Sequence, residues 1–136
     1  MAASLSLLLG NNTMDLAQAQ ARIAAFLDNH GIGDEAAYTT RLAVEELVTN
    51  ILRYGYDDTL AHRINVSVVV AGSAIELRIE DDGHVFDPTA APPVVAPASL
   101  DFAAEGGRGL MLVREMVGPL QYERANGKNR ITLRIS

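Results

Sequence analysis

The sequence contains no cysteine and no tryptophan, and only 5% of its 136 residues are aromatic. The lack of cysteine excludes disulfides, zinc–thiolate sites, iron–sulfur clusters and a thiol nucleophile. Basic residues are also scarce, because 11 lysines and arginines stand against 17 acidic residues and give a formal net charge of −6. Since nucleic acids are bound through clustered basic side chains, we expect no direct nucleic-acid partner.

Long apolar runs are absent as well, so we expect no membrane partner. The N-terminal stretch MAASLSLLLG has no basic residue before its apolar run and is a poor signal peptide. We therefore expect a cytoplasmic protein. Leu5, Leu7 and Leu9 share one parity, which is typical of a β-strand. These leucines either pack into the core or supply the surface of a homodimer.

The periodicity of the rest predicts a single domain over residues 1–136. Helical spacing and alternation predict, in order, a helix that follows a turn at 11–13 and ends near Gly31, a helix at about 35–54, a hairpin at 64–79, a helix at 110–117, and strands near 120–124 and 130–135. Asp34 is expected to cap the second helix. The fold class is α+β: a two-layer α/β sandwich with the helices on one face of a mixed, mostly antiparallel sheet.

Three groups of residues depart from these patterns. The first is Glu46, Asn50 and Arg53, which lie at i, i+4 and i+7 and share a helix face opposite the apolar stripe. A carboxylate, an amide oxygen and a guanidinium in a row could hold a metal and phosphates, and the carboxylate could act as a base. The alternative is an ordinary solvated helix face.

The second group surrounds Asp81, which continues the inward alternation of Leu77 and Ile79. An inward carboxylate needs a partner, and a ligand's amino group could be that partner. Gly83 has no side chain, so a ligand could approach the backbone closely there. The alternative is that the strand has already ended and residues 81–83 form a simple turn.

The third group is Gly106-Gly107-Arg108-Gly109-Leu110, which opens the helical segment at 110–117. Backbone N–H groups at a helix N-terminus are suited to phosphate. The spacing is neither that of a Walker A loop nor that of a dinucleotide fingerprint, so a conventional P-loop enzyme or Rossmann dehydrogenase is disfavoured.

Taken in this order, the three groups resemble the boxes of the GHKL, or Bergerat-fold, ATPases, which include gyrase B, MutL and the sensor histidine kinases. Residues 46–50 (ELVTN) resemble the N box, residues 81–83 (DDG) the first glycine box and residues 107–110 (GRGL) the second. Within this group the sequence is most similar to the anti-sigma-factor serine/threonine kinases. The resemblance covers nearly the whole chain and implies the Bergerat ATP-binding fold.

The resemblance also implies ATP and Mg²⁺ as cofactors. Asn50 would ligate the Mg²⁺, and Glu46 would be the general base acting on a partner's serine hydroxyl. Asp81 would accept a hydrogen bond from the adenine amino group, and residues 84–106 would form the ATP lid. The implied nucleotide-binding residues are Asn50, Arg53, Asp81, Gly83, Gly107, Arg108, Gly109 and Leu110. Arg53 and Arg108 either contact phosphate or lie in solvent.

The implied function is that of a serine/threonine protein kinase. It would phosphorylate a STAS-type anti-sigma-factor antagonist and regulate a sigma factor by partner switching. The alternative is an ATP-dependent module that sequesters a partner with little or no kinase activity. Glu46 favours the kinase, because nucleotide sensing alone needs no base at that position. A sensor histidine kinase is disfavoured, since no dimerisation helices with a phospho-accepting histidine precede the domain.

Overall fold

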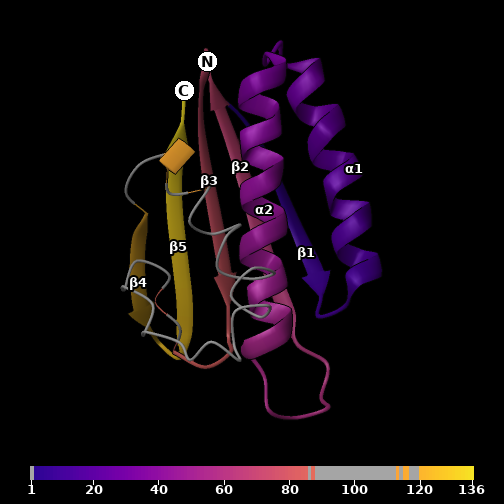
Figure 1. Ribbon diagram of the computed structural model, residues 1–136, viewed down its shortest axis with the longest axis vertical. Helices are drawn as coiled ribbons and strands as arrows, with labels where there is room; N and C mark the ends of the chain where they lie inside the picture. Colours follow the sequence, from indigo (N-terminus) through magenta and orange to yellow (C-terminus); the bar gives the residue numbers. More distant parts are fainter. Residues whose placement is uncertain (1, 86, 88–112, 114, 117–119) are drawn as a thin grey trace, which may run out of the picture.

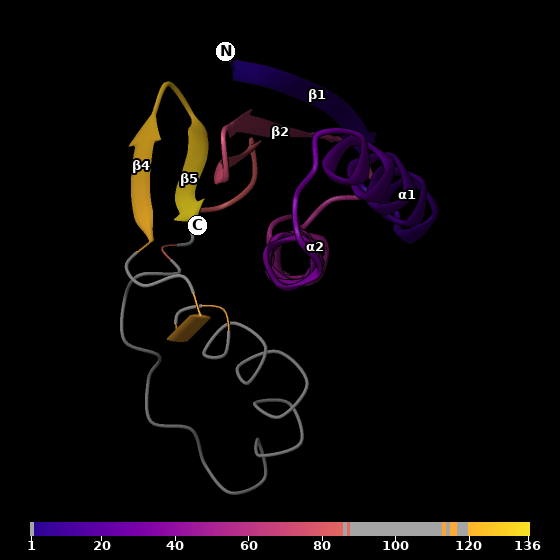
Figure 2. The same ribbon diagram turned by 90° about the horizontal axis from the view of Figure 1, so that it is seen from above.

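The chain forms one five-stranded sheet with two helices on one of its faces (Figures 1 and 2). This computed structural model describes residues 2–85, 87, 113, 115–116 and 120–136. Its elements are β1 (Ala2–Gly10), α1 (Thr13–Asn29), α2 (Asp34–Tyr54), β2 (Arg63–Ala71), β3 (Ala74–Asp81), β4 (Gln121–Ala125) and β5 (Lys128–Ile135). The expected α+β two-layer architecture is confirmed.

The strand order is β1-β2-β3-β5-β4, and every neighbouring pair is antiparallel. Among the described strands there is therefore no parallel pair of the kind that a mixed sheet contains. The β4–β5 hairpin turns through Asn126 and Gly127, both at positive φ (55° and 75°). This two-residue turn is the tightest that fits the twist of paired strands, and it lets β5 begin earlier than the periodicity predicted.

The core lies between the sheet and the helices. Among its largest fully buried side chains are Ile23 and Leu27 of α1, Val44, Leu47 and Val48 of α2, Ile64, Val66 and Val68 of β2, Ile75, Leu77 and Ile79 of β3, and Leu133 of β5. In β1, Leu7 and Leu9 are buried in this core and Leu5 packs against it, whereas Leu8 on the other parity is 57% exposed. The three leucines of one parity thus pack into the core.

The two helices begin differently. Asn12 caps α1, because its side-chain oxygen accepts the Asp15 N–H at 2.8 Å, and the Asp15 carboxylate accepts the Gly10 N–H at 2.8 Å. The prediction that Asp34 caps α2 is wrong. Gly33 occupies that position without a side-chain hydrogen bond, and Asp34 is the first helical residue, where its charge still favours the positive end of the helix dipole.

The end of α2 and the end of β3 touch through their backbones. The His84 N–H donates to the Gly55 carbonyl at 2.8 Å. A Cβ added to Gly83 would lie 2.5 Å from that same carbonyl oxygen, which is closer than real Cβ atoms approach. A glycine at position 83 is therefore required by packing within the protein itself. No helix in the described part of the chain is long and apolar enough to cross a membrane.

Candidate functional site

A small cavity lies where the C-terminal half of α2 meets the end of β3. Its lining residues are Leu47, Asn50, Ile51, Gly55, Asp81, His84 and Ile131. Asn50 is only 5% exposed and Asp81 only 4%. Two polar side chains that the sequence singled out in separate motifs therefore meet in a pocket that is otherwise mainly apolar, the usual character of a small-molecule site.

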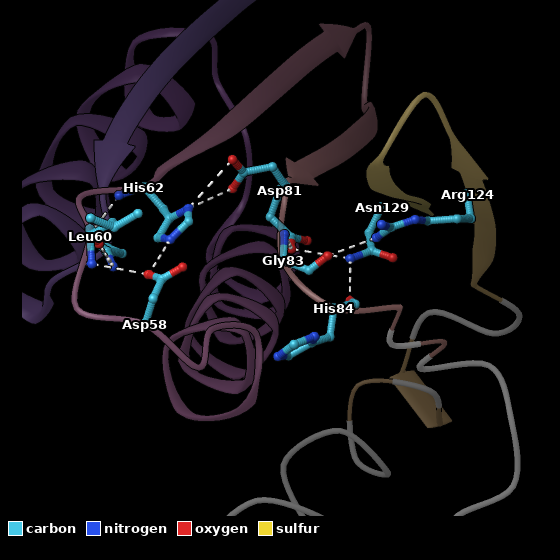
Figure 3. Close-up of polar contacts among 10 residues, drawn as sticks. Asp58, Leu60, His62, Asp81, Gly83, His84, Arg124 and Asn129 are labelled. Atoms are coloured by element: carbon cyan, nitrogen blue, oxygen red, sulfur yellow. Dashed lines mark hydrogen bonds and ion pairs between the residues drawn. The ribbon is translucent and has the colours of Figure 1, made fainter.

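Asp81 is the last residue of β3 and pairs with Asn129 of β5. Its inward direction is confirmed, and the alternative of a simple turn is wrong, because the strand hydrogen bonding continues to this residue. Its Oδ2 accepts the Gly83 N–H at 2.9 Å and Asn129 Nδ2 at 3.2 Å (Figure 3). Within the described residues both bonds end on Oδ2, which leaves Oδ1 as an acceptor for a ligand's donor.

Side chains of the β4–β5 hairpin hydrogen-bond to residues 81–84, where the chain turns after the end of β3; residues 81–83 are called the Asp81–Gly83 turn. Asn129 is 1% exposed and donates from Nδ2 to the His84 carbonyl at 2.7 Å as well as to Asp81, while its Oδ1 accepts the Tyr122 hydroxyl. Arg124 Nη1 donates to the Gly83 carbonyl at 2.8 Å. Asn129 is not among the predicted site residues, because the periodicity placed the start of the last strand at residue 130. The signal was present, since Asn129 shares the inward parity of Ile131.

Burial raises the pKa of the Asp81 carboxyl, while the hydrogen bonds from Gly83 and Asn129 lower it and the Asp82 charge raises it further. The net direction is upward, so the folded chain holds this proton more tightly than the unfolded chain does. The charged form of Asp81 consequently costs stability. This cost is absent at low pH, develops as the pH rises through the interval between the unfolded and folded pKa values, and is complete above it.

We therefore expect Asp81→Asn to raise the free energy of unfolding of the nucleotide-free protein at pH 7. The gain should shrink as the pH falls and vanish below the pKa of aspartate in the unfolded chain, about 3.9. Urea unfolding followed by circular dichroism between pH 3.5 and 8 measures it. Asp28→Asn, which removes an exposed carboxylate from α1, controls for the loss of one charge. If the wild-type protein is more stable than Asp81→Asn at every pH, the charged form of Asp81 does not destabilise the folded protein.

On α2, Asn50 and Glu46 lie in different environments. The expectation that both share a polar face opposite the apolar stripe is wrong for Asn50, which is buried beside that stripe because this side of α2 faces the end of β3. The solvated-face alternative therefore does not apply to it. Glu46 is half-buried, and its pKa is raised by burial and by the Glu45 charge, while Arg53 lowers it. A carboxylate shifted upward is better matched to proton transfer near neutral pH.

Several expected site residues fall outside the described residues. Gly107, Arg108, Gly109 and Leu110 lie there, as does the lid apart from residues 84, 85 and 87. Arg53 is described and exposed at the end of α2. The structure thus brings together Asn50, Asp81 and Gly83.

The side chains at the cavity can hold a magnesium ion that is bound together with a nucleotide. Among the described residues, no group of three or more histidine, aspartate or glutamate side chains could hold a metal. Mg²⁺ bound with a nucleotide takes most of its oxygens from phosphates and water and few from protein. One buried amide oxygen at Asn50, beside a cavity, matches this small demand.

Comparison with known proteins decides the family. Residues 10–135 match the family described as "Histidine kinase-like ATPase domain". The chain belongs to the histidine kinase-like ATPase family. The resemblance noted from the three motifs is thereby confirmed at the level of the family.

Two relatives illustrate the similarity. The chain is 32% identical over 96 residues to the serine/threonine-protein kinase BtrW of Bordetella bronchiseptica, over 71% of this chain and 68% of that protein. It is 28% identical over 93 residues to the serine-protein kinase RsbW of Staphylococcus epidermidis, over 65% of this chain. That second match spans 58% of the RsbW protein, which is less than two thirds of its length.

A solved structure shows the same fold. The crystal structure of the RsbU and RsbW domains of a Mycobacterium tuberculosis protein superposes with a TM-score of 0.69 at 17% identity. The superposition covers 98% of this chain and 32% of that one. The histidine kinase-like ATPase chain described here therefore has the architecture of an RsbW-type domain.

Proposed function

We propose that this protein is an ATP-binding serine/threonine protein kinase of the anti-sigma-factor type. Its substrate would be a serine on a STAS-type anti-sigma-factor antagonist, and its output would be partner switching with a sigma factor in the cytoplasm. The observation that carries the proposal is the meeting of buried Asp81 and buried Asn50 at one cavity, with half-buried Glu46 one helical turn before Asn50.

Asp81 is suited to bind the adenine amino group. Its Oδ2 is held by Gly83 and Asn129, so its Oδ1 is fixed in direction and presents an acceptor. A buried acceptor that is already oriented loses little entropy when a ligand donor arrives, and it rejects a ligand that presents an acceptor instead. This selects an exocyclic amino group over a carbonyl at the same place on the base.

Phosphoryl transfer needs positioned groups more than covalent chemistry. Bound Mg²⁺ would offset the charge of the phosphates, and the Asn50 side-chain oxygen would be its protein ligand. Gly107, Arg108, Gly109 and Leu110 are proposed phosphate contacts, together with Arg53. Glu46 would take the proton of the serine hydroxyl while the serine oxygen bonds to the γ-phosphorus and ADP leaves.

The test is direct phosphorylation. The protein is mixed with each purified STAS-domain protein of its own organism and with Mg²⁺ and γ-labelled ATP, and the products are analysed for phosphoserine. We expect one of these proteins to become labelled on serine. If the protein binds ATP and a STAS-domain protein but no serine is labelled, the kinase assignment is wrong. The protein is then an ATP-dependent module that sequesters its partner.

A further inference from the structure

Both ring nitrogens of His62 face a carboxylate. Nε2 lies 2.7 Å from Asp58 Oδ1 (Figure 3), and Nδ1 lies 3.2 Å from Asp82 Oδ1. The side chain is only 15% exposed. A neutral imidazole carries a single N–H and can donate to one of these carboxylates, whereas the imidazolium ion donates to both. The geometry is therefore that of a charged histidine bridging two acids.

The bridge joins two separate segments. Asp58 and His62 belong to the loop of residues 55–62 between α2 and β2, and Asp82 directly follows Asp81 at the end of β3. The His62 ring stacks on Tyr56 of the same loop, with ring centroids 4.0 Å apart and an interplanar angle of 12°. The backbone N–H of His62 also donates to Asn11 Oδ1 at 3.2 Å, and this bond links the loop to the residues just before α1.

The same loop touches the Asp81–Gly83 turn at its other end. Gly55 accepts the His84 N–H at 2.8 Å, and its carbonyl lies against Gly83. The loop thus holds the turn twice, through Gly55 at one end and through His62 and Asp82 at the other. One of these two links is a backbone bond that pH does not change. The other depends on the charge of an imidazole.

We propose that His62 is a positioning residue that holds the Asp81–Gly83 turn in its nucleotide-binding arrangement while its ring is charged. The affinity for adenine nucleotides then falls as the pH rises and the ring loses its second proton. His62 would act through Asp82 and the turn, without touching the nucleotide. The nucleotide part of this inference rests on the proposed function, whereas the control of the turn does not.

The charged groups around the ring determine the direction in which the pKa of His62 is shifted, and therefore the direction of the pH dependence. The hydrogen bond with Asp58 raises the pKa of His62 most, and Asp82 raises it further, while burial lowers it. Tyr56 faces the ring as a neutral phenol, since burial and the charges of Asp81 and Asp82 raise its own pKa. A histidine with a raised folded pKa contributes its full effect below its unfolded pKa and loses it as the pH rises through the folded pKa. Nearby His84 pairs separately with Asp57 at 2.9 Å, and both side chains are well exposed.

The first measurement is Mg·ADP affinity by calorimetry from pH 6 to pH 9, compared with the His62 titration followed by NMR. We expect the dissociation constant to rise about 3- to 10-fold along the His62 titration, a fraction of one charge-assisted hydrogen bond. His30→Gln, at the end of α1, is the matched control and should keep this rise. His62→Gln should show only the pH dependence of the nucleotide itself. Asp82→Asn removes one carboxylate, so it should move the midpoint to lower pH without altering the histidine.

The second measurement uses the nucleotide-free protein. Protection of the His84 amide against hydrogen exchange, corrected for intrinsic rates, should fall along the His62 titration in the wild type and not in His62→Gln. If neither the protection of the His84 amide nor the affinity for Mg·ADP changes along the His62 titration, the inference is overturned. If no variant binds Mg·ADP at any pH, the proposed function is wrong, and the exchange measurement still decides whether His62 holds the turn.

Discussion

Glu46→Gln is expected to lower the rate of serine phosphorylation by about 10²- to 10⁴-fold while ATP still binds, since general-base catalysis contributes that range. Glutamine keeps the shape of the side chain but cannot accept the hydroxyl proton. The half-buried position and raised pKa of Glu46 fit this role, because a base near the working pH is the most effective one. Single-turnover transfer of labelled phosphate to the STAS-domain substrate measures the rate, and calorimetry measures the binding.

The neighbouring carboxylate supplies the control. Glu45 is exposed on the side of α2 that faces α1, where it accepts a hydrogen bond from Gln20 at 3.3 Å. Glu45→Gln removes the same charge from the same turn of helix and should leave the transfer rate within a few-fold of wild type. Transfer at the original rate by Glu46→Gln would show that this residue is not the base.

Asp81→Asn is expected to weaken ATP binding by about 5- to 150-fold, the cost of one good hydrogen bond in a buried site. Gly83 and Asn129 both donate to Oδ2, so the asparagine oxygen must take that place to satisfy them. Its amino group then occupies the place of Oδ1 and meets the adenine amino group donor to donor. Calorimetry with Mg·ATP at pH 7.5 measures the change.

Asp28→Asn again serves as the control, because its exposed carboxylate on α1 lies outside the cavity. The expected rise in stability of Asp81→Asn at pH 7 separates weak binding from misfolding, since a destabilised protein would show both losses together. Equal affinities of the wild-type and Asp81→Asn proteins would remove this residue from the nucleotide site.

Local periodicity was sufficient for the described helices and strands and for one buried acid, whereas the helix expected at 110–117 lies largely outside the described residues. The alternation Leu77, Ile79, Asp81 predicted an inward carboxylate, and the structure confirms it, because side chains in a strand alternate between the two faces with a period of two. The order of the three motifs was sufficient for the family. Both signals are contained in short stretches of chain, which is why no tertiary information was needed to find them.

Other features depend on contacts between distant segments. The pairing of Asp81 with Asn129 follows from the register of β3 against β5, and register is set by the packing of the whole sheet. The burial of Asn50 follows from the packing of the C-terminal half of α2 beside the end of β3, which helical spacing alone does not specify.

By itself, then, the sequence determined that this is an α+β chain of the histidine kinase-like ATPase family with an inward acid at position 81. Only the tertiary structure decided what holds that acid in place. Asn129 and Arg124 reach the turn from the β4–β5 hairpin, and His62 reaches Asp82 from the loop after α2. The parity of Asn129 gives the direction of its side chain but not its partner, and Arg124 and His62 carry no local pattern that marks them, because hydrogen-bond geometry between distant residues exists only once the core has packed and the strands are in register.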